Sequence, residues 1–266
     1  MMERSTNGAP IATSVAPAPS AQLAPKLSVV IPVRNEGVNL RIMIRILGAA
    51  IEVPYEVLVV HDDERDDSIA AVEAMGDRRA QLVHNRLGGG VANAIRSGIE
   101  RARGEYVLIF AADEVGPVLA IEEMLRLMDR GCDLVSCTRY ARGGRRLGGS
   151  RIGGILSRAA NATFQAFTGS VLTDSTTGIK MIRRSVFARL DLKAAPVGWA
   201  VAFEMAIKAQ LAGLQLGEVP IVSIDRLYGG ESTFHVGPWV LEYLRWFWFG
   251  VRNVRDLRKN GRRLLT

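Results

Sequence analysis

The stretch LSVVIPVRNE, Leu27 to Glu36, and the stretch EVLVVHDDERDDS, Glu56 to Ser68, decide the fold of this chain. Each begins with an apolar run rich in Val and Ile, too short for a typical helix, that ends abruptly in polar residues. Such runs are typical of buried parallel strands, whose carboxyl ends bring side chains to one edge of a sheet. Ligands of open α/β sheets bind at that edge. We therefore expect Asp62 to meet the ribose or base of a nucleotide, with Pro32 and Glu36 on the neighbouring strand end.

The same alternation continues along the chain and predicts one α/β domain with a mostly parallel central sheet, flanked by helices. A tail without periodicity, rich in Ala, Pro, Ser and Thr, is expected to be disordered at residues 1–25, before a domain at 26–236 and an amphipathic segment at 237–266. After the first strand, further strands are expected at 55–60, 80–84, 106–110, 134–138 and 215–224. Helices are expected at 39–50, 68–75, 91–102, 117–130, 155–168 and 203–212, with a loop at 142–154 and a strand and helix across 178–190.

Composition narrows the class of partner. The 266 residues are 48% hydrophobic and carry a net charge of +7, which favours anionic partners. The basic residues gather at 142–158 and 252–263 without a recognisable nucleic-acid-binding motif, so nucleic acid is disfavoured. Cys132 and Cys137 match no redox or metal spacing and are expected to be reduced packing residues. No run is long enough to span a membrane and no signal peptide is evident, which predicts a cytoplasmic protein.

Several motifs occur together and in order between Leu27 and Thr233. They are PVRNE at 32–36, Asp62, LGGGVANAIRSGIERARGEYVL at 87–108, AADE at 111–114, SCTRY at 136–140, LSRAAN at 156–161, DSTTGIKMIRR at 174–184 and EVPIVSIDRLYGGES at 218–232. In these motifs the chain resembles family 2 glycosyltransferases. Among them it is most similar to dolichyl or polyprenyl-phosphate mannosyltransferases.

The resemblance implies a GT-A fold and an inverting transfer from a nucleotide-activated sugar, with Mg²⁺ or Mn²⁺ on the diphosphate. Residues that match the family's nucleoside-binding positions are Pro32, Arg34, Glu36 and Asp62. Asp113 matches the last aspartate of the metal-binding DxD motif. Arg139 and Arg226 match arginines that face the diphosphate and the acceptor phosphate.

The chain also departs from the family pattern. Ala111 stands where the family usually has the first aspartate of DxD, Val115 where some relatives place a polar metal ligand, and Arg34 where many place an aromatic residue. Hard cations are often held by one or two carboxylates plus substrate phosphates, so Asp113 alone can suffice, with weaker metal affinity. Glu114 follows on an extended segment and is expected to point the opposite way.

Plainer structural roles remain open for the acidic candidates. Asp62 or Asp66 can cap the following helix, and Asp113 can be a solvated loop carboxylate. Asp174 can be a turn residue or lie beside the acceptor or the sugar. Glu204, on an apolar helix, can be a satisfied core carboxylate or a base near the acceptor.

The basic and glycine-rich motifs also have plainer structural interpretations. Arg139 and Arg226 can be surface arginines, but each follows an expected strand, where a guanidinium fork matches a diphosphate or phosphate. The glycines at 88–90 lack the GxGxxG spacing, which argues against a dinucleotide-binding oxidoreductase.

The acceptor decides whether a general base is needed. A lipid phosphate is largely dianionic at neutral pH and attacks without one, whereas a hydroxyl requires one, with Asp174 or Glu204 as candidates. Arg151 and Ser157 are the hypothesised acceptor-phosphate ligands, since Gly153 and Gly154 stand where the family has its basic residue.

The C-terminal segment favours a lipid substrate. Trp239, Tyr243, Trp246 and Phe247 fall at helical spacing, and six basic residues follow between Arg252 and Arg263. This pattern is typical of a helix in a membrane interface, although an aromatic helix packed on the domain or in a dimer contact has the same spacing.

The sequence thus favours transfer of a sugar from a GDP-mannose or UDP-glucose type of donor to a polyprenyl phosphate, by a protein peripheral on the cytoplasmic face of the membrane. Two alternatives remain. The acceptor can instead be a hydroxyl of a glycan, protein or small molecule. Ala111 also leaves open a nucleotide-sugar-binding module without transfer activity.

Overall fold

The computed structural model describes residues 24–148, 151–224, 236–260, 264 and 265. Within these ranges the strands are β1 (Leu27–Pro32), β2 (Tyr55–His61), β3 (Ala80–His84), β4 (Tyr106–Ile109), β5 (Leu134–Thr138), β6 (Arg145–Leu147), β7 (Lys180–Arg183), β8 (Leu216–Pro220) and β9 (Val222–Ile224). The α-helices are α1 (Gly37–Ala50), α2 (Asp67–Met75), α3 (Val91–Arg101), α4 (Ile121–Asp129), α5 (Arg151–Thr168), α6 (Ala200–Leu211), α7 (Val236–Arg252) and α8 (Val254–Asn260). Two 3₁₀ helices are η1 (Gly116–Ala120) and η2 (Arg184–Leu190).

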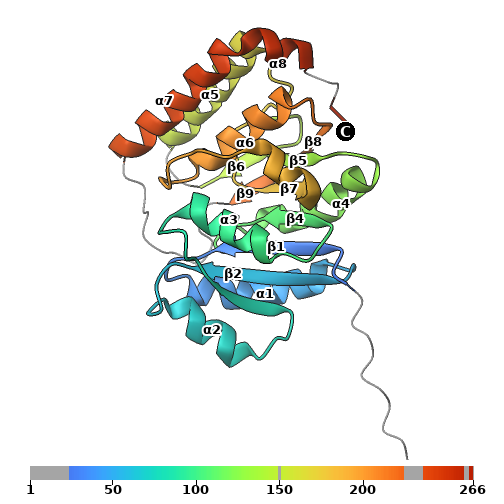
Figure 1. The fold of residues 1–266 in the computed structure, drawn as a ribbon, viewed down its shortest axis with the longest axis vertical. Coiled ribbons are helices and arrows are strands. Elements are labelled where there is room, and N and C mark those ends of the chain that lie inside the picture. Colours follow the sequence, from blue (N-terminus) through green and yellow to red (C-terminus); the bar gives the residue numbers. More distant parts are fainter. Residues whose placement is uncertain (1–23, 149–150, 225–235, 261–263, 266) are drawn as a thin grey trace, which may run out of the picture.

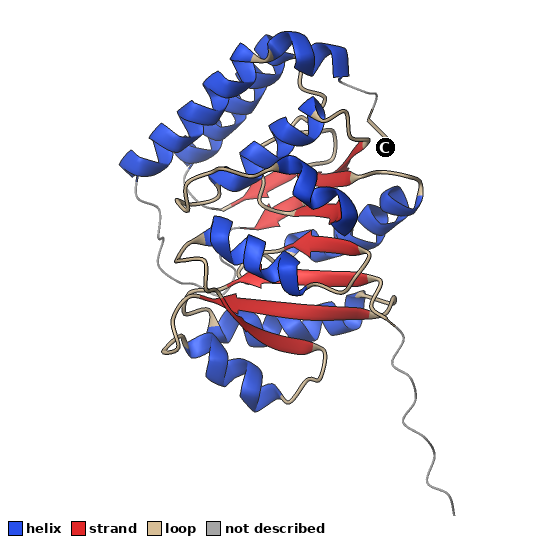
Figure 2. Ribbon diagram, viewed as in Figure 1, coloured by secondary structure: helices blue, strands red, loops and turns tan. Residues whose placement is uncertain are grey.

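A seven-stranded sheet with the order β3-β2-β1-β4-β7-β5-β8 runs through the middle of the molecule (Figure 2). All neighbouring strands in it are parallel except β7, which runs antiparallel to both β4 and β5. The sequence-based prediction of a mostly parallel sheet flanked by helices is confirmed. Because parallel strands present their carboxyl ends at one edge, the residues after β2, β1, β4 and β5 share that edge.

Apolar side chains fill both faces of this sheet, as expected for strands buried on both sides. One core lies between the sheet and the helices α1 and α4, and the other between the sheet and α3 and α6. Side chains of α5, α7 and α8 extend the second core as an outer layer, and Figure 1 shows α5 and α7 side by side at one end of the molecule.

Most predicted elements form within a residue or two of their expected bounds, but several differ. The expected strand at 215–224 divides at Pro220, which lacks a backbone N–H, and β9 leaves the main sheet to pair with β6. That pairing places a short strand inside the expected loop at 142–154. The expected helix at 117–130 begins with the 3₁₀ helix η1. The helix expected within 178–190 is the 3₁₀ helix η2.

The helix α5 begins at Arg151, four residues earlier than expected, and runs through Gly153 and Gly154. Each glycine costs a helix about 1 kcal/mol relative to alanine. Burial of Phe164 and Thr168 further along the same helix offsets this cost, because packing overrides local propensity.

Candidate functional site

The candidate residues that the structure describes gather at the carboxyl edge of the sheet. Asp62 directly follows the end of β2, Arg34 and Glu36 follow β1, Asp113 follows β4 and Arg139 follows β5. The strand β7 separates β4 from β5, yet Glu114 lies within electrostatic range of Arg139. Asp62, Asp113 and Arg139 therefore share one edge, whereas the predicted Arg226 lies outside the described residues.

The loop after β1 is held rigid by the start of α2. Three consecutive backbone N–H groups, of residues 35–37, donate to the Asp66 carboxylate at 3.1 Å, the Ser68 hydroxyl at 3.1 Å and the Asp67 carboxylate at 2.9 Å. Asp66 also caps α2 through the Ser68 N–H at 2.9 Å. The carboxylates at 66 and 67 thus fix the loop that carries two of the predicted nucleoside-binding residues.

Those loop residues differ in exposure. Pro32 ends β1 and is half-buried, while Arg34 is exposed at the edge of the sheet. Glu36 is half-buried and its carboxylate accepts from the Asn39 amide at 2.7 Å. This geometry leaves Arg34 available to a ligand and places Glu36 in the wall of the loop.

Asp62 lies in a preorganised setting between β3 and the glycine turn at 88–90. Its carboxylate accepts from the Asn85 amide at 2.7 Å and from the Gly90 N–H at 2.8 Å, and the side chain remains exposed. Gly90 has φ 108°, and a Cβ there would lie 2.3 Å from the Pro196 carbonyl oxygen, so only glycine fits. The glycines therefore serve a turn that orients Asp62.

Asn85 is a site residue that the sequence analysis missed. It is buried, donates to Asp62 and to the Gly88 carbonyl oxygen at 2.8 Å, and accepts from the Ser97 hydroxyl at 2.9 Å. The available signal was its position directly after β3, at the same sheet edge as Asp62.

Asp113 is half-buried and stands apart from other acceptors. No hydrogen bond or ion pair reaches its carboxylate from the described part of the chain, and no cluster of three metal-ligating side chains occurs there. Ala111 stands where the family usually has the first aspartate of DxD, and it has no side-chain oxygen to offer a metal. A hard divalent cation fits this single carboxylate only if substrate phosphate oxygens complete its coordination.

Arg139 and Asp174 form a buried, two-pronged ion pair. The Arg139 Nε and Nη2 donate to the two carboxylate oxygens of Asp174 at 2.7 and 3.0 Å, and the Asp174 side chain is 0% exposed. Burial favours the neutral acid, but the Arg139 guanidinium outweighs it and holds the pKa of the Asp174 carboxyl below its ordinary value. Asp174 therefore orients Arg139, and its oxygens are engaged rather than open to a proton from an acceptor.

Two further buried charges adjoin this pair. Glu218 accepts from the backbone N–H and hydroxyl of Thr173, both at 2.8 Å, and burial raises the pKa of its carboxyl. The Lys180 ammonium donates to the Ser136 hydroxyl at 2.8 Å. Burial lowers the pKa of Lys180 to about 8, against the attraction of Asp174 and Glu218. Neither Glu218 nor Lys180 was singled out by sequence.

Glu204 and Ser157 are also engaged. The fully buried Glu204 accepts from the backbone N–H groups of Lys193 and Ala194 and pairs with the Lys208 ammonium at 2.7 Å, as a satisfied core carboxylate does. The Ser157 hydroxyl accepts from the Tyr140 hydroxyl at 2.8 Å, which ties α5 to the loop after β5. Arg151 begins α5, and its side chain lies outside the described residues.

The aromatic residues of the C-terminal segment pack largely inward. Trp246 is 3% exposed and joins the core with Tyr243 and Phe247 of α7, while Glu242 accepts from the Trp246 ring N–H at 3.0 Å. The spacing that predicted a membrane-facing stripe is thus mostly core packing. The outward face of α7 instead carries Val240, Leu241, Leu244 and Trp248.

Neither cysteine takes part in the site. Cys132 and Cys137 are buried free thiols whose pKa burial raises, as expected for packing residues. Across the described ranges, no helix combines the length and apolar character needed to cross a bilayer.

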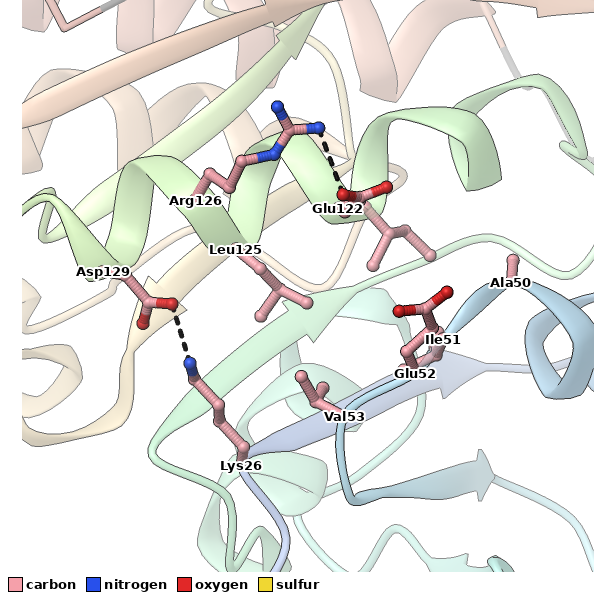
Figure 3. A pocket seen from close by; sticks show the side chains of 10 residues that line it. Lys26, Ala50, Ile51, Glu52, Val53, Glu122, Leu125, Arg126 and Asp129 are labelled. Carbon is pink, nitrogen blue, oxygen red and sulfur yellow. Dashed lines mark hydrogen bonds and ion pairs between the residues drawn. The ribbon is translucent and has the colours of Figure 1, made fainter.

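A small pocket of about 160 Å³ lies at the opposite, amino-terminal edge of the sheet (Figure 3). An ion pair of 2.7 Å between Lys26 and Asp129 closes one side of it. This pocket lies across the sheet from Asp62 and Arg139 and is therefore separate from the candidate site. The other residues that line it are Ala50, Ile51, Glu52, Val53, Ile121, Glu122, Leu125 and Arg126.

Comparison with known proteins identifies the family. The model of glycosyl transferase family 2 matches residues 28–191. Polyprenol monophosphomannose synthase from Mycolicibacterium smegmatis is 30% identical over 236 residues, covering 79% of this chain and 85% of that protein. Dolichol-phosphate mannosyltransferase from Pyrococcus furiosus is 26% identical over 224 residues, covering 83% of this chain. This chain spans only 62% of the length of the Pyrococcus protein. It spans 34% of glycosyltransferase AglD from Haloferax volcanii, to which it is 29% identical over 77% of its own length.

Solved structures agree on the fold. Glucosyl-3-phosphoglycerate synthase from Mycobacterium tuberculosis, bound to Mn²⁺, UDP-glucose and phosphoglyceric acid, superposes with a TM-score of 0.65 at 19% identity, covering 88% of this chain and 82% of that one. The same enzyme with Mg²⁺ and UDP gives a TM-score of 0.59 at 19% identity, over 91% of this chain and 81% of that one. The predicted GT-A fold is confirmed. The chain is a glycosyltransferase that belongs to family 2.

Proposed function

We propose that this glycosyltransferase moves a sugar from a nucleoside diphosphate donor to a polyprenyl phosphate, with inversion at the anomeric carbon. The observation that carries the proposal is the state of the candidate bases. Asp174 and Glu204 are fully buried, and their oxygens are occupied by Arg139 and by backbone N–H groups and Lys208. A hydroxyl acceptor requires a base, whereas a phosphate with a second pKa near about 6 attacks as an anion.

The sheet edge has the groups that such a transfer needs. Asp62, Arg34 and Glu36 border the nucleoside side of the edge, and Arg139 lies where charge grows on the departing diphosphate. A fixed guanidinium there stabilises the transition state more than the ground state. The names of two relatives specify mannose, which supports mannose as the transferred sugar, and the UDP-glucose complex of the structural neighbour supports a UDP-glucose type of donor.

A divalent cation is part of the proposal. Asp113 would hold Mg²⁺ or Mn²⁺ together with the donor's diphosphate oxygens, and the ion would neutralise charge on the leaving group. Both ions occur in crystals of the structural neighbour. The free carboxylate of Asp113 is the support within this chain.

Product analysis tests the function. Purified protein is incubated with labelled GDP-mannose or UDP-glucose, Mn²⁺ and vesicles that contain polyprenyl phosphate. We expect label in the organic phase from one of the two donors, released by mild acid as expected for a glycosyl phosphate. Label that appears only in water-soluble products would overturn the lipid acceptor, and no label in any product would favour a nucleotide-sugar-binding module.

We further propose that the protein is peripheral at the cytoplasmic face of the membrane, through the outward faces of α5 and α7. More than half of the exposed large hydrophobic side chains in the described ranges lie on these two helices. Arg158, Arg245 and Arg252 are exposed beside them, and no exposed acidic side chain is described on either helix. A second copy of the chain would bring like charges together, whereas anionic lipid complements them.

Vesicle flotation measures this binding. Changing both Leu244 and Trp248 to glutamate is expected to lower the partition onto vesicles of anionic lipid about tenfold or more. The variant loses apolar area that would be buried in the membrane, and it adds negative charge that anionic lipid repels. The matched control is Leu119→Glu, at a side chain that is 90% exposed on η1, and it should bind like the wild type. Equal loss in both variants would show that the α5 and α7 face is not the docking surface.

A further inference from the structure

Three polar residues lie side by side on neighbouring strands behind the candidate site. In the strand order β7-β5-β8, Ser136 stands opposite Lys180 on one side and opposite Glu218 on the other. Residues that stand opposite each other in a sheet project from the same face. All three side chains are buried, and the Lys180 Nζ donates to the Ser136 hydroxyl at 2.8 Å. We call Lys180, Ser136 and Glu218 the polar rung.

The polar rung is connected to the Arg139–Asp174 ion pair through Glu218. The Glu218 carboxylate accepts from the backbone N–H of Thr173 at 2.8 Å and from that of Asp174 at 3.1 Å. The Asp174 carboxylate in turn accepts from the Arg139 guanidinium at 2.7 and 3.0 Å. The polar rung therefore fixes the backbone of the residue that orients the guanidinium at the sheet edge.

Lys180 is a costly residue at this position. Its side chain is 0% exposed, and within the described residues it makes a hydrogen bond to Ser136 but no direct ion pair. A buried ammonium without an adjacent carboxylate lowers the stability of a fold. Burial also lowers the pKa of Lys180 to about 8, although Asp174 and Glu218 attract its charge. Stability alone therefore does not explain a lysine at this position.

The titratable groups around Lys180 keep their own charges while it loses its proton. Pairing with Asp174 outweighs burial and raises the pKa of the Arg139 guanidinium, and the same pair holds the pKa of Asp174 below its ordinary value. Burial raises the pKa of the Cys137 thiol, which stays neutral. Burial raises the pKa of Glu218 as well, but its hydrogen bonds from residues 173 and 174 favour the carboxylate. Deprotonation of Lys180 thus removes a positive charge that no neighbour replaces.

We infer that Lys180 is a positioning residue of the donor site, whose positive charge balances Glu218 behind Arg139 and leaves the guanidinium its full attraction for the departing diphosphate. The inference rests on the proposed role of Arg139 at the diphosphate, but on no particular acceptor. When Lys180 is neutral, Glu218 is unbalanced, and the sheet edge is more negative by one unit of charge. That charge repels a diphosphate. Affinity for the diphosphate is therefore complete below the pKa of Lys180 and declines as pH rises through it.

Equilibrium binding of nucleotides to the full chain tests this inference. Titration calorimetry with Mg²⁺ gives the Kd of GDP or UDP, whichever binds more tightly, between about pH 7 and about pH 9.5. We expect the Kd to rise at least about 5-fold across the pKa of Lys180, because one charge near the phosphates is lost. The monophosphate of the same nucleoside is the matched ligand, and its Kd should change less than about 2-fold. A constant Kd for the diphosphate, or an equal rise for the monophosphate, would overturn the inference.

A charge-neutral double variant gives a second readout. Lys180→Met with Glu218→Gln removes one charge of each sign, and a glutamine carbonyl can still accept from the N–H groups of residues 173 and 174. In this variant the ratio of the alkaline to the neutral Kd should be less than about 2-fold. The control, Lys26→Met with Asp129→Asn, neutralises a lysine–carboxylate pair at the opposite edge of the sheet and should keep the wild-type rise. A rise of wild-type size in the Lys180 variant would show that another group titrates. The wild-type titration decides the question by itself if the variant does not fold.

The transfer assay keeps the inference distinct from the proposed function. A protein that transfers no sugar but loses affinity for the diphosphate at alkaline pH, as expected, would support the role of Lys180 and contradict the function. Transfer to prenyl phosphate by a protein whose diphosphate affinity is independent of pH would support the function and contradict the role of Lys180.

Discussion

Asp113→Asn is expected to lower kcat/KM at least about 100-fold, within the range seen when one preorganised group that stabilises developing charge is removed. The carboxylate is half-buried, unpaired within the described residues and beyond the end of β4, so it contributes little to the stability of the fold. The free energy of unfolding of the variant should therefore differ from that of the wild type by less than about 0.5 kcal/mol, as is usual for a surface substitution. Transfer rates and urea unfolding on the same preparations measure the two effects.

Glu122→Gln serves as the matched control for Asp113→Asn, because it neutralises an exposed carboxylate on α4 that lines the pocket at the opposite, amino-terminal edge of the sheet. It should keep wild-type kinetics. The complementary change, Ala111→Asp, supplies the carboxylate that the motif lacks and should lower the Mn²⁺ concentration for half-maximal activity. Full activity in Asp113→Asn over a range of Mn²⁺ concentrations would remove Asp113 from the site.

The positions of Asp62 and Asp113 followed from sequence because they depend on strand ends alone. An apolar run that stops at a carboxylate fixes the edge on which that carboxylate lies, once the strands are parallel. Asn85 obeys the same rule after β3, but an amide after a strand is too common to single out. In the sequence, the glycines at 88–90 only argued against a dinucleotide-binding motif, because the close approach of Gly90 to Pro196 and its N–H bond to Asp62 depend on tertiary structure.

The pairing of Arg139 with Asp174 could not be predicted in this way. The two residues are 35 positions apart, and their meeting depends on β7 running antiparallel between β4 and β5. No local pattern encodes that insertion. The family resemblance suggested a phosphate-facing Arg139 without naming its partner. Only the fold shows that Asp174 is fully buried.

The orientation of α7 was hidden for a different reason. Its aromatic residues occupy more than one side of the helix, so spacing alone does not tell the buried side from the exposed one. Trp246 faces the core because α6 lies beneath it, whereas Trp248, two residues later, is 56% exposed. The membrane proposal therefore rests on the outward aliphatic residues and Trp248 rather than on the predicted stripe.

Asp174→Asn is expected to lower the free energy of unfolding by about 3–5 kcal/mol, because it leaves buried charge without its partner. Among the described residues, Arg139 would then keep the attraction of Glu114, and Lys180 that of Glu218. The matched control is Asp129→Asn, which breaks an ion pair to Lys26 with the same 2.7 Å separation but with side chains 33% and 48% exposed. Such exposed pairs contribute about 0–1 kcal/mol, so urea unfolding should separate the two variants clearly.

Changes in pH give this prediction a second readout. The folded-state pKa of Asp174 lies below 3.8, so its ionised form stabilises the fold fully above pH 3.8, and this stabilisation is lost as pH falls through the folded pKa. The deficit of Asp174→Asn relative to wild type should thus be larger in mild acid than in strong acid, where the carboxyl of the wild type is also neutral. A deficit that stays the same down to the lowest pH at which wild type remains folded would contradict an ionised Asp174.

Function should fall with stability in the same variant, for a distinct reason. Without Asp174 the Arg139 guanidinium loses the fork that orients it, so kcat/KM should drop at least about 100-fold even at temperatures where the variant is folded. Adding Lys180→Met to Asp174→Asn removes the second unbalanced cation and should recover part of the unfolding free energy, but none of the activity. Recovery of activity together with stability would mean that Asp174 acts only on folding and that Arg139 needs no positioning residue.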